Sequence, residues 1–345
     1  MRGAILNKPF VLDLPNVRST ILAGSSIAQA VAALYATSPV KSCHLLRRGF
    51  NHVYQLEFAN GKLCVARLSS LRPRGAPNVA YETAMLLHLK SKGAAVAAPW
   101  MAKTGKAFTS IALAEGERAL VVFDHLPGEP PGEALLDIEA MGEGLARLHA
   151  CAEGYSGPQS LYTIGIVDTL QMPVQHLLCA STLDNELRKQ IGALSTRLQE
   201  RIAAMPALSR VACHGDCHGG NTHITTAANG ARIASFFDFD DALPGYLASD
   251  LAVYCWACLG NKTSLDDKAL QRWKCFMKGY HRARAVSSDD IDAIPAFALV
   301  RMLWLLGEYA ARSAEWGSEV LPKAWLKKQL ENMAAWETLR VPYAG

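Results

Sequence analysis

The sequence feature that most constrains the fold is a polar loop that runs into a short β-hairpin. Asp216 and Asn221 lie in the loop, and apolar residues follow it. The Asn-Gly pair at 229–230 is a typical hairpin turn, and an apolar run at 233–237 continues from it and ends at Asp238. The hairpin therefore predicts that two carboxylates and one amide oxygen lie at the same end of two paired strands.

The loop also carries a spacing that is typical of enzymes that move phosphoryl groups. His214, Asp216 and Asn221 have the spacing of the kinase catalytic loop, H-R-D-x-x-x-x-N. In that loop the Asp accepts the proton of the acceptor hydroxyl and the Asn holds magnesium, and a second Asp after a short strand is also a metal ligand. We therefore predict Asp216 as the catalytic base and Asn221 and Asp238 as metal ligands. A chance match of a polar loop is the alternative, and the correct order of loop, hairpin and Asp argues against it.

The front of the chain contains a candidate site for the phosphates of a nucleotide. In kinases a Lys on the third strand contacts the α- and β-phosphates and pairs with a Glu on the following helix. Arg67 lies on the third predicted strand and Glu82 on the following predicted helix. An Arg offers the same charge in a planar fork, so we predict that Arg67 steadies the phosphates and Glu82 steadies Arg67. A surface ion pair without a role in binding is the alternative.

Two further segments are candidates for contact with the nucleotide. Gly49 and Asn51 lie in the turn of the first predicted hairpin and would let it approach phosphate, although a G-x-G-x-x-G loop is absent. The backbone from Asp124 to Leu126 follows a buried strand, and its N–H and C=O groups are free to pair with the edge of an adenine ring. We therefore expect these four residues to belong to the nucleotide site.

The distribution of predicted elements indicates an α+β fold with two lobes, as in protein kinases. Strands are predicted at 43–46, 53–58, 63–68 and 120–123, and helices at 27–35 and 81–92 and from 137 onward. The back of the chain is mostly helical apart from the hairpin. We therefore divide the 345 residues into a nucleotide-binding lobe, 1–125, and a helical lobe with the catalytic loop and acceptor site, 126–345.

The charge distribution and the cysteine content indicate which class of partner the protein binds and in which cellular compartment it lies. The net charge of +4 is unevenly distributed, with 15 Lys and Arg against 6 Asp and Glu in residues 1–125, and 20 against 25 in the remainder. A basic front suits a polyanionic nucleotide and an acidic back suits a cationic acceptor, although uneven surface solvation explains the pattern equally well. A basic stripe with interleaved aromatic residues is absent, which argues against nucleic acid. Nine cysteines without framework spacing predict reduced thiols and a cytoplasmic protein.

The sequence also gives no indication of a membrane protein. Apolar runs long enough to span a bilayer are absent. The first nine residues lack the apolar core and cleavage site of a signal peptide, so none is expected.

Several motifs resemble the aminoglycoside phosphotransferase and choline kinase family. They are HGDCHGGN at 214–221, FDFDDA at 237–242, SDLA at 249–252 and LARLHA at 145–150. The pattern is most similar to the bacterial stress-response kinase branch. The resemblance implies a two-lobed kinase-like fold, magnesium and a nucleoside triphosphate. It also implies that His214 is structural and that Asp250 anchors the catalytic loop from a helix. Arg67, where many members have Lys, leaves GTP as an alternative to ATP.

We interpret the chain as a magnesium-dependent phosphotransferase that moves the γ-phosphoryl group of ATP to a hydroxyl of a small molecule, amine-bearing and similar to an aminoglycoside, choline or homoserine. The first alternative is a protein Ser/Thr kinase of the stress-response type. Against it, an A-P-E segment is absent and Asp238 runs directly through 242–245 into a helix. The second alternative is a non-catalytic nucleotide-binding protein, which the intact set of Asp216, Asn221 and Asp238 argues against. A helix with Trp304 and Tyr309 either lines the acceptor pocket or belongs to the core, and the core is favoured.

Overall fold

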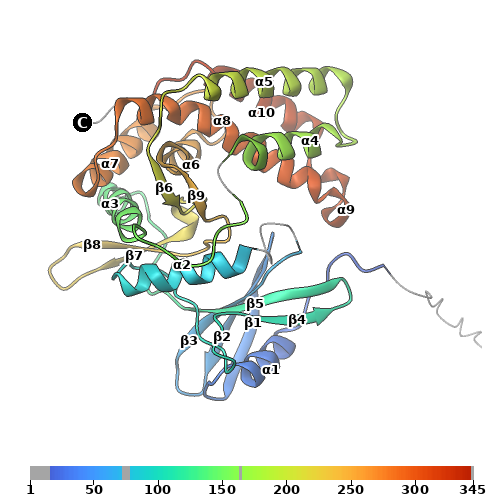
Figure 1. Ribbon diagram of the computed structural model, residues 1–345, viewed down its shortest axis with the longest axis vertical. Helices are drawn as coiled ribbons and strands as arrows, with labels where there is room; N and C mark the ends of the chain where they lie inside the picture. Colours follow the sequence, from blue (N-terminus) through green and yellow to red (C-terminus); the bar gives the residue numbers. More distant parts are fainter. Residues whose placement is uncertain (1–15, 72–77, 163–164, 343–345) are drawn as a thin grey trace, which may run out of the picture.

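The computed structural model describes residues 16–71, 78–162 and 165–342, and these form two lobes (Figure 1). A small lobe built on a β-sheet lies against a larger, mostly helical lobe, so the expected α+β kinase-like architecture is confirmed. The stretch where no signal peptide was expected lies outside the described residues. Among the helices of the described ranges, none has the length and apolar character to cross a bilayer.

The small lobe contains a five-stranded antiparallel sheet in the order β1-β2-β3-β5-β4, with two helices. Its elements are α1 (Gly24–Leu34), β1 (Val40–Arg48), β2 (His52–Phe58), β3 (Leu63–Leu68), α2 (Val79–Ser91), β4 (Thr109–Leu113) and β5 (Gly116–Asp124). β4 was not predicted, because its five residues alternate between partly buried and exposed and carry no long apolar run. The predicted boundary at residue 125 falls one residue after the end of β5.

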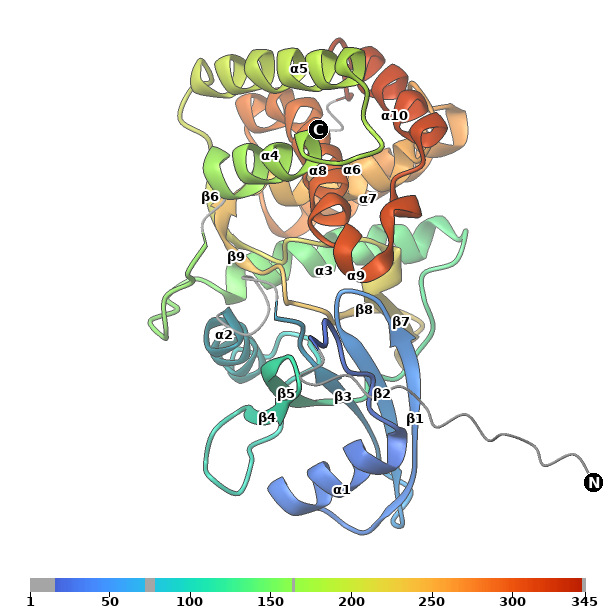
Figure 2. The same ribbon diagram turned by 90° about the vertical axis from the view of Figure 1, so that its right-hand side faces the viewer.

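Strand β5 shows how the sheet connects two apolar cores. Leu120 and Val122 face the core that α1 covers, on the side of the sheet away from the helical lobe (Figure 2). Val121 and Phe123 belong to the other core, which α2 shares with the helical lobe. Because successive side chains of a strand point to opposite faces, a continuously apolar strand is buried on both sides. The face of the sheet with Val121 and Phe123 therefore packs on α2, and α2 connects this face to the helical lobe.

The helical lobe is built on long helices, of which α3 and α7 approach very closely. Its helices are α3 (Leu135–Cys151), α4 (Met172–Leu178), α5 (Asn185–Ala203), α6 (Leu247–Leu259), α7 (Asp267–Ala283), α8 (Ser288–Ala311), α9 (Ser313–Trp316) and α10 (Lys323–Trp336), with short helical turns η2 (Val167–Gln171), η3 (Gly219–Asn221) and η4 (Ser318–Val320). A Cβ atom at Gly142 would lie 1.9 Å from the carbonyl oxygen of Phe276, and one at Gly279 would lie 1.9 Å from that of Glu139. These two glycines therefore permit the contact between α3 and α7.

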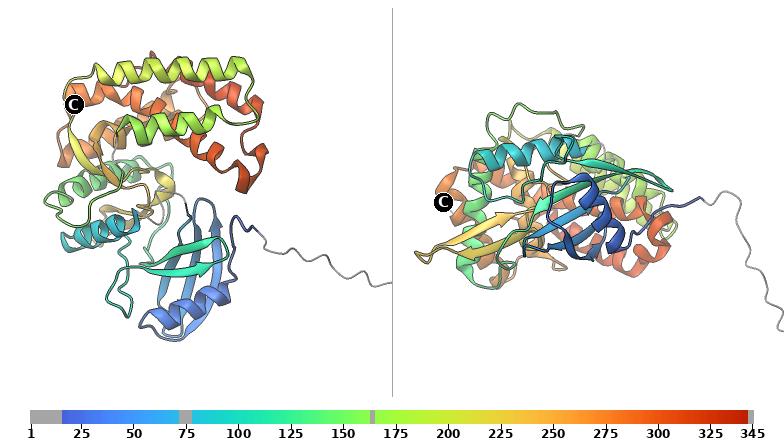
Figure 3. Two further views of the ribbon diagram at one scale, coloured as in Figure 1. Left: turned by 45° about the vertical axis from the view of Figure 1, so that its right-hand side comes forward. Right: turned by 90° about the horizontal axis from the view of Figure 1, so that it is seen from below.

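Two short antiparallel pairs frame the catalytic loop. The predicted hairpin is present as β7 (Thr222–Thr226) and β8 (Arg232–Phe236), and it projects from the side of the molecule (Figure 3). The second pair, β6 (Arg210–Cys213) with β9 (Leu243–Tyr246), was not predicted. Residues 242–245 lead directly into α6, as expected, and β9 pairs with β6 just before that helix begins.

The β7–β8 hairpin is also bound to the small lobe. Phe236 donates its N–H to the carbonyl of Ala95 at 2.9 Å, and Ala97 donates to the carbonyl of Phe236 at 3.0 Å. The segment that leaves α2 therefore runs beside β8 and connects the sheet to the end of the hairpin, where Asp238 lies.

Candidate active site

A buried carboxylate on α6 holds the catalytic loop in place. Asp250 accepts the N–H of His214 at 2.8 Å and that of Gly215 at 2.9 Å, one on each oxygen. The ring of His149 on α3 lies 2.9 Å from the same carboxylate. Burial alone would raise the pKa of Asp250, but the His149 ring and the loop hold it below its usual range. The anchor that the family resemblance implied is therefore present.

His214 has a structural role in the loop. Its ring is fully buried, lies 4.2 Å from the ring of Phe239 between centroids, and places Nε2 3.1 Å from the carbonyl oxygen of Phe237. Burial lowers its pKa, so the ring stays neutral near pH 7. Gly215 beside it has a φ of +83°, and a Cβ there would lie 2.1 Å from the carbonyl oxygen of Asp241. The loop path therefore requires glycine at this position.

Both oxygens of the predicted catalytic base, Asp216, have partners. Asn221 Nδ2 donates to Asp216 Oδ2 at 3.1 Å and to its carbonyl at 3.0 Å, and His218 Nε2 lies 3.5 Å from Oδ2. Arg301 on α8 forms an ion pair with Oδ1. Burial would raise the pKa of Asp216, but Arg301 and His218 lower it below the usual range. Asp216 is therefore ionised and able to accept a hydrogen bond from a hydroxyl.

Sequence reasoning missed Arg301 as a member of the site. It lies 85 residues beyond Asp216, on a helix whose apolar and aromatic spacing indicates core packing. The only available signal was a cationic residue within an otherwise apolar helical stretch, and this signal does not specify a contact.

Asp238 has an unusual backbone conformation. Its φ is +66°, and it is the only non-glycine residue with a positive φ in the described ranges. Such a conformation is uncommon outside glycine and tends to occur at functional sites. It places the carboxylate 3.7 Å from Arg67, and the N–H of the preceding Phe237 donates to the carbonyl of Asn221 at 3.2 Å. The end of β8 and the start of β7 therefore bring Asn221 and Asp238 together.

The donors at this end of the hairpin suit a hard divalent cation. Asn221 uses its Nδ2 for Asp216, which leaves its Oδ1 as the atom suited to a metal. Burial and the carboxylate of Asp240 raise the pKa of Asp238, while Arg67 opposes the rise. Carboxylate and amide oxygens are the ligands that magnesium prefers. The charge of a bound cation would also offset the repulsion between neighbouring carboxylates.

The predicted pair of Arg67 and Glu82 is present and buried. Arg67 NH1 donates to Glu82 Oε1 at 2.7 Å and NH2 donates to Oε2, in a bidentate arrangement. The side chains are 4% and 2% exposed, so the alternative of a surface ion pair is wrong. Arg67 also lies over the ring of Phe123, 5.2 Å from its centroid. Contact of Arg67 with phosphate stays a prediction.

A cavity of about 310 Å³ lies between the lobes beside these residues. Arg67, Asn221 and Asp238 contribute to its wall. Its apolar lining comes from both lobes: Leu46, Val53, Val65, Leu86, Ala97, Phe123, Leu126 and Phe237. An apolar space with charged and amide groups on its wall can hold a nucleotide base next to its phosphates.

The predicted adenine-binding connector borders this cavity. Asp124 and Leu126 both line it. The Asp124 side chain accepts from Trp100 Nε1 at 2.8 Å and lies 3.6 Å from the ammonium of Lys90, and the Leu126 carbonyl faces His223 Nδ1 at 3.2 Å. These contacts fix the connector, while its pairing with adenine stays a prediction.

The first hairpin turn contacts both lobes of the protein. Asn51 Nδ2 donates to Asp240 Oδ2 at 2.6 Å, and Asn51 Oδ1 accepts from the N–H of Ser70 at 3.0 Å. Phe50 packs 5.3 Å from the ring of Trp316 between centroids. Neither Gly49 nor Asn51 is among the described residues that line the cavity. The turn thus joins the two lobes, and its approach to phosphate stays a prediction.

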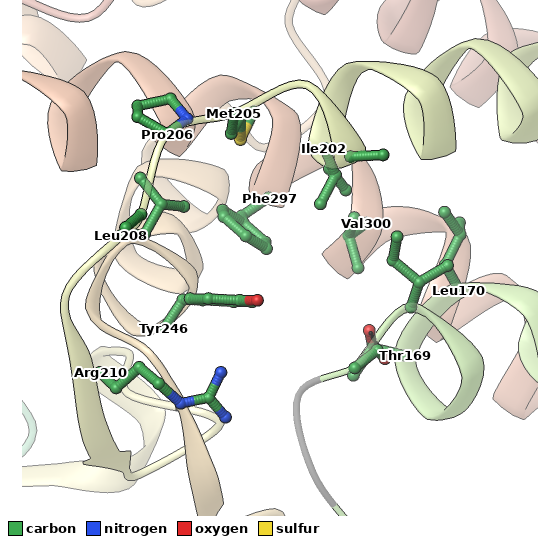
Figure 4. A pocket seen from close by; sticks show the side chains of 14 residues that line it. Thr169, Leu170, Ile202, Met205, Pro206, Leu208, Arg210, Tyr246, Phe297 and Val300 are labelled. Carbon is green, nitrogen blue, oxygen red and sulfur yellow. Dashed lines mark hydrogen bonds between the residues drawn. The ribbon is translucent and has the colours of Figure 1, made fainter.

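A second cavity, of about 530 Å³, lies in the helical lobe (Figure 4). The Tyr246 hydroxyl and the Arg210 guanidinium point toward it, opposite Thr169. Its other walls are mainly apolar: Leu170, Ile202, Met205, Leu208, Phe297 and Val300. A small cavity of about 30 Å³ beside Gly215, Arg301 and Trp304 shares Thr169, Phe297 and Val300 with it. The large cavity is therefore close to the catalytic loop. Trp304 is buried, as expected for a core residue, and it also lines the small cavity.

Comparisons with known proteins agree with this geometry. The family model of the phosphotransferase enzyme family matches residues 42–286. A protein of Deinococcus radiodurans described as uncharacterized is 31% identical over 320 residues, which cover 92% of this chain and 91% of that protein. A homoserine kinase of Hyphomonas neptunium is 24% identical and covers 78% of this chain and 79% of its own length.

Solved structures share the fold. Amicoumacin kinase hAmiN, in complex with AMP-PNP, Ca²⁺ and Ami, superimposes with a TM-score of 0.72 at 19% identity, over 89% of this chain and 93% of that one. The family match covers the sheet of the small lobe from within β1 onward, the catalytic loop and the hairpin. The chain therefore belongs to the phosphotransferase enzyme family and has a kinase-like fold.

Proposed function

We propose that this protein transfers the γ-phosphoryl group of ATP to a hydroxyl of a small molecule in a magnesium-dependent reaction. The observation that carries the proposal is the convergence of Asp216, Asn221 and Asp238 beside a cavity between the lobes. Phosphoryl transfer needs positioning and neutralised charge more than covalent chemistry, and this arrangement offers both.

The nucleotide would occupy the cavity between the lobes. Its base would lie among the apolar side chains, with its edge against the carbonyl of Asp124 and the N–H of Leu126. Arg67, held in one orientation by Glu82, would contact the α- and β-phosphates. The same connector atoms can pair with guanine, so GTP stays an alternative phosphoryl donor.

The metal would be held by Asn221 Oδ1 and the carboxylate of Asp238. Bound magnesium would supply charge neutralisation at the phosphate oxygens. Asn221 directly precedes β7 and Asp238 follows β8 by two residues, so the β7–β8 register brings the two residues to the same end of the hairpin.

The acceptor would enter from the helical lobe and place its hydroxyl at Asp216. Asp216 orients this hydroxyl and accepts its proton as the acceptor oxygen bonds to the γ-phosphorus. The bond from that phosphorus to the β–γ bridging oxygen breaks, and ADP leaves. The short segment from Asp238 through β9 to α6 contains no activation loop, which favours a small molecule over a protein acceptor.

Labelled ATP tests this proposal and separates it from the two alternatives. Purified protein and magnesium are added to an extract of the source cell with γ-labelled ATP, with Asp216→Ala as the inactive control. We expect label in a small-molecule fraction with the wild type only. Label on protein would favour a protein kinase, and equal transfer by Asp216→Ala would contradict the role of Asp216.

A further inference from the structure

The side chain of Arg301 faces the reacting centre from the acceptor side. Its NH2 group pairs with Asp216 Oδ1, and NH1 lies 3.5 Å from the carbonyl of Gly215. The guanidinium lies 4.4 Å from the ring centroid of Trp304 and 5.4 Å from that of Trp256. The side chain is only 11% exposed. Arg301 is therefore a buried cation fixed beside the group that must receive the acceptor hydroxyl.

The contacts of Asp216 in this structure compete with its proposed role. Asn221 donates to Oδ2 and Arg301 pairs with Oδ1, so an incoming hydroxyl competes with these donors for the remaining lone pairs of the carboxylate. Asn221 is tied to the loop by a second hydrogen bond, to the Asp216 carbonyl. Arg301 is thus the donor that can be exchanged. A buried guanidinium that loses its carboxylate is costly unless another anion replaces it.

Arg301 also has donor capacity that is not used. Its Nε is buried and has no hydrogen-bond partner in the described part of the chain. A guanidinium forms its strongest contacts with planar anions such as carboxylates, through paired N–H groups. The site therefore contains a preformed receptor for one anionic group, which Asp216 fills in this structure.

The lining of the two neighbouring cavities agrees with an anionic and otherwise apolar ligand. Arg210 is the only charged side chain among the described residues that line the large cavity. The small cavity next to the loop has Arg301 and Asp241. Aromatic and aliphatic side chains form most of the remaining wall, together with the hydroxyls of Thr169 and Tyr246. A cationic acceptor would find few carboxylates here, whereas a carboxylate would find two arginines.

We propose that the acceptor is a hydroxy acid whose carboxylate binds Arg301 and whose apolar body occupies the large cavity. The inference rests on the proposed function and names its substrate class. Because Arg301 and Asp216 are in contact, the carboxylate and the reacting hydroxyl lie within a few bonds of each other. The carboxylate takes the guanidinium from Asp216, and Oδ1 becomes available to the hydroxyl.

This inference replaces the expectation of a cationic acceptor, which was drawn from the acidic net charge of residues 126–345. Net charge is summed over the whole surface of a lobe, whereas recognition depends on the few side chains that line the pocket. Arg210 and Arg301 both belong to the acidic part of the chain, yet they are two of the three charged residues among the described residues that line these cavities, and Asp241 is the third.

A matched set of probes tests the inference by calorimetry, without phosphoryl transfer. The set is 3-hydroxyoctanoate, its neutral primary amide and the cationic 1-amino-3-octanol, titrated into the full-length protein. We expect the wild type to bind the hydroxy acid at least tenfold more tightly than either other probe. Tightest binding of the amine, equal binding of all three, or binding of none would overturn the inference.

Variants of Arg301 assign the preference to this side chain. Arg301→Gln should lose the preference for the hydroxy acid, and Arg301→Lys, which keeps the charge and the packing volume, should retain part of it. The matched control is Arg147→Gln, an arginine that is 68% exposed on α3 and should change nothing. A preference that survives in a folded Arg301→Gln protein would overturn the role of Arg301.

The outcome also separates this inference from the proposed function. Preference for the hydroxy acid without any Asp216-dependent phosphoryl transfer would support the binding inference and contradict the proposed function. Asp216-dependent transfer to an amine-bearing acceptor, unaffected by Arg301→Gln, would overturn the inference and leave the proposed function in place.

Discussion

Asp250 and His214 are joined by a buried hydrogen bond of 2.8 Å from the backbone N–H of His214 to the carboxylate of Asp250. The other oxygen of Asp250 binds the N–H of Gly215, so one side chain of α6 fixes the loop that carries Asp216. The position of the predicted catalytic base therefore depends on the core of the helical lobe.

Asp250→Asn should reduce both stability and turnover. The amide replaces one acceptor oxygen by a donor that faces an N–H group, so a buried backbone group loses its partner. We expect the free energy of unfolding to fall by about 3 kcal/mol and kcat to fall at least tenfold. Urea unfolding and a phosphoryl-transfer assay measure the two effects. Asp289→Asn, at an exposed position of α8, is the matched control, and equal behaviour of both variants would contradict the anchoring role.

Asp238→Asn should abolish turnover through the loss of metal binding. The amide keeps the shape of the side chain but removes the charge that a divalent cation requires. We expect kcat to fall by about a thousandfold, which corresponds to about 4 kcal/mol in the transition state. The dependence of ATP binding on magnesium should weaken in parallel, and a magnesium titration of ATP affinity measures it. Turnover equal to that of the wild type would refute this ligand assignment.

The buried pair of Arg67 and Glu82 allows stability and nucleotide binding to be separated. Arg67→Met leaves the Glu82 carboxylate buried without its partner and should cost about 3–5 kcal/mol in unfolding free energy. Combining it with Glu82→Leu removes that charge and should restore most of the stability, while ATP affinity stays reduced in both proteins. Unfolding and ATP titrations are compared side by side. Full ATP affinity in the double variant would contradict a phosphate-binding role for Arg67.

The exposed pair of Arg147 and Glu143 provides the control for this experiment. Its partners are one turn apart on α3, and the arginine is largely solvent-exposed. Replacing either residue should change the unfolding free energy by about 0.5 kcal/mol or less. A cost as large as that of Arg67→Met would show that burial is not the cause.

His52 should make stability depend on pH. Burial, together with Arg118 and Arg48, lowers the pKa of His52 to about 4 in the folded protein, against about 6.5 in an unfolded chain. The unfolded state therefore binds the proton first as pH falls, so the contribution is fully present above about pH 6.5 and is lost between there and about pH 4. We expect the wild type to lose about 2 kcal/mol between about pH 7.5 and pH 5 that His52→Gln does not lose. An unfolding free energy that changes equally with pH in the wild type and in His52→Gln would contradict this role of His52.

Much of the site could be predicted because its pattern is local. Asp216, Asn221 and Asp238 are joined by one hairpin, and an Asn-Gly turn between apolar strands specifies that hairpin from nearby residues alone. Arg67 and Glu82 are also predictable, since a strand and the following helix contain them in order. The two-lobed architecture follows from the change from strand to helix patterns along the chain.

The remainder depends on contacts between distant segments. β6 and β9 are four residues each, and the catalytic loop and the β7–β8 hairpin separate them in the sequence. Neither strand therefore has a local pattern that specifies the pairing. Arg301 reaches Asp216 only because α8 packs beside the loop, and its helical spacing indicates no more than an apolar face. The turn at Asn51 was expected to approach phosphate. The contact of Asn51 with Asp240, which joins the two lobes, could not be predicted because the two residues are far apart in the sequence.

The most direct test of the account compares phosphoryl transfer and nucleotide binding in Asp216→Asn. This change keeps the shape of the side chain and removes the group that orients and deprotonates the acceptor hydroxyl. We predict that transfer from γ-labelled ATP to the acceptor falls at least a thousandfold, while the Kd for magnesium-ATP changes less than threefold and Asp289→Asn retains full activity. Transfer by Asp216→Asn within tenfold of the wild type, in a folded protein that binds ATP, would contradict the assignment of this loop as the phosphotransferase centre.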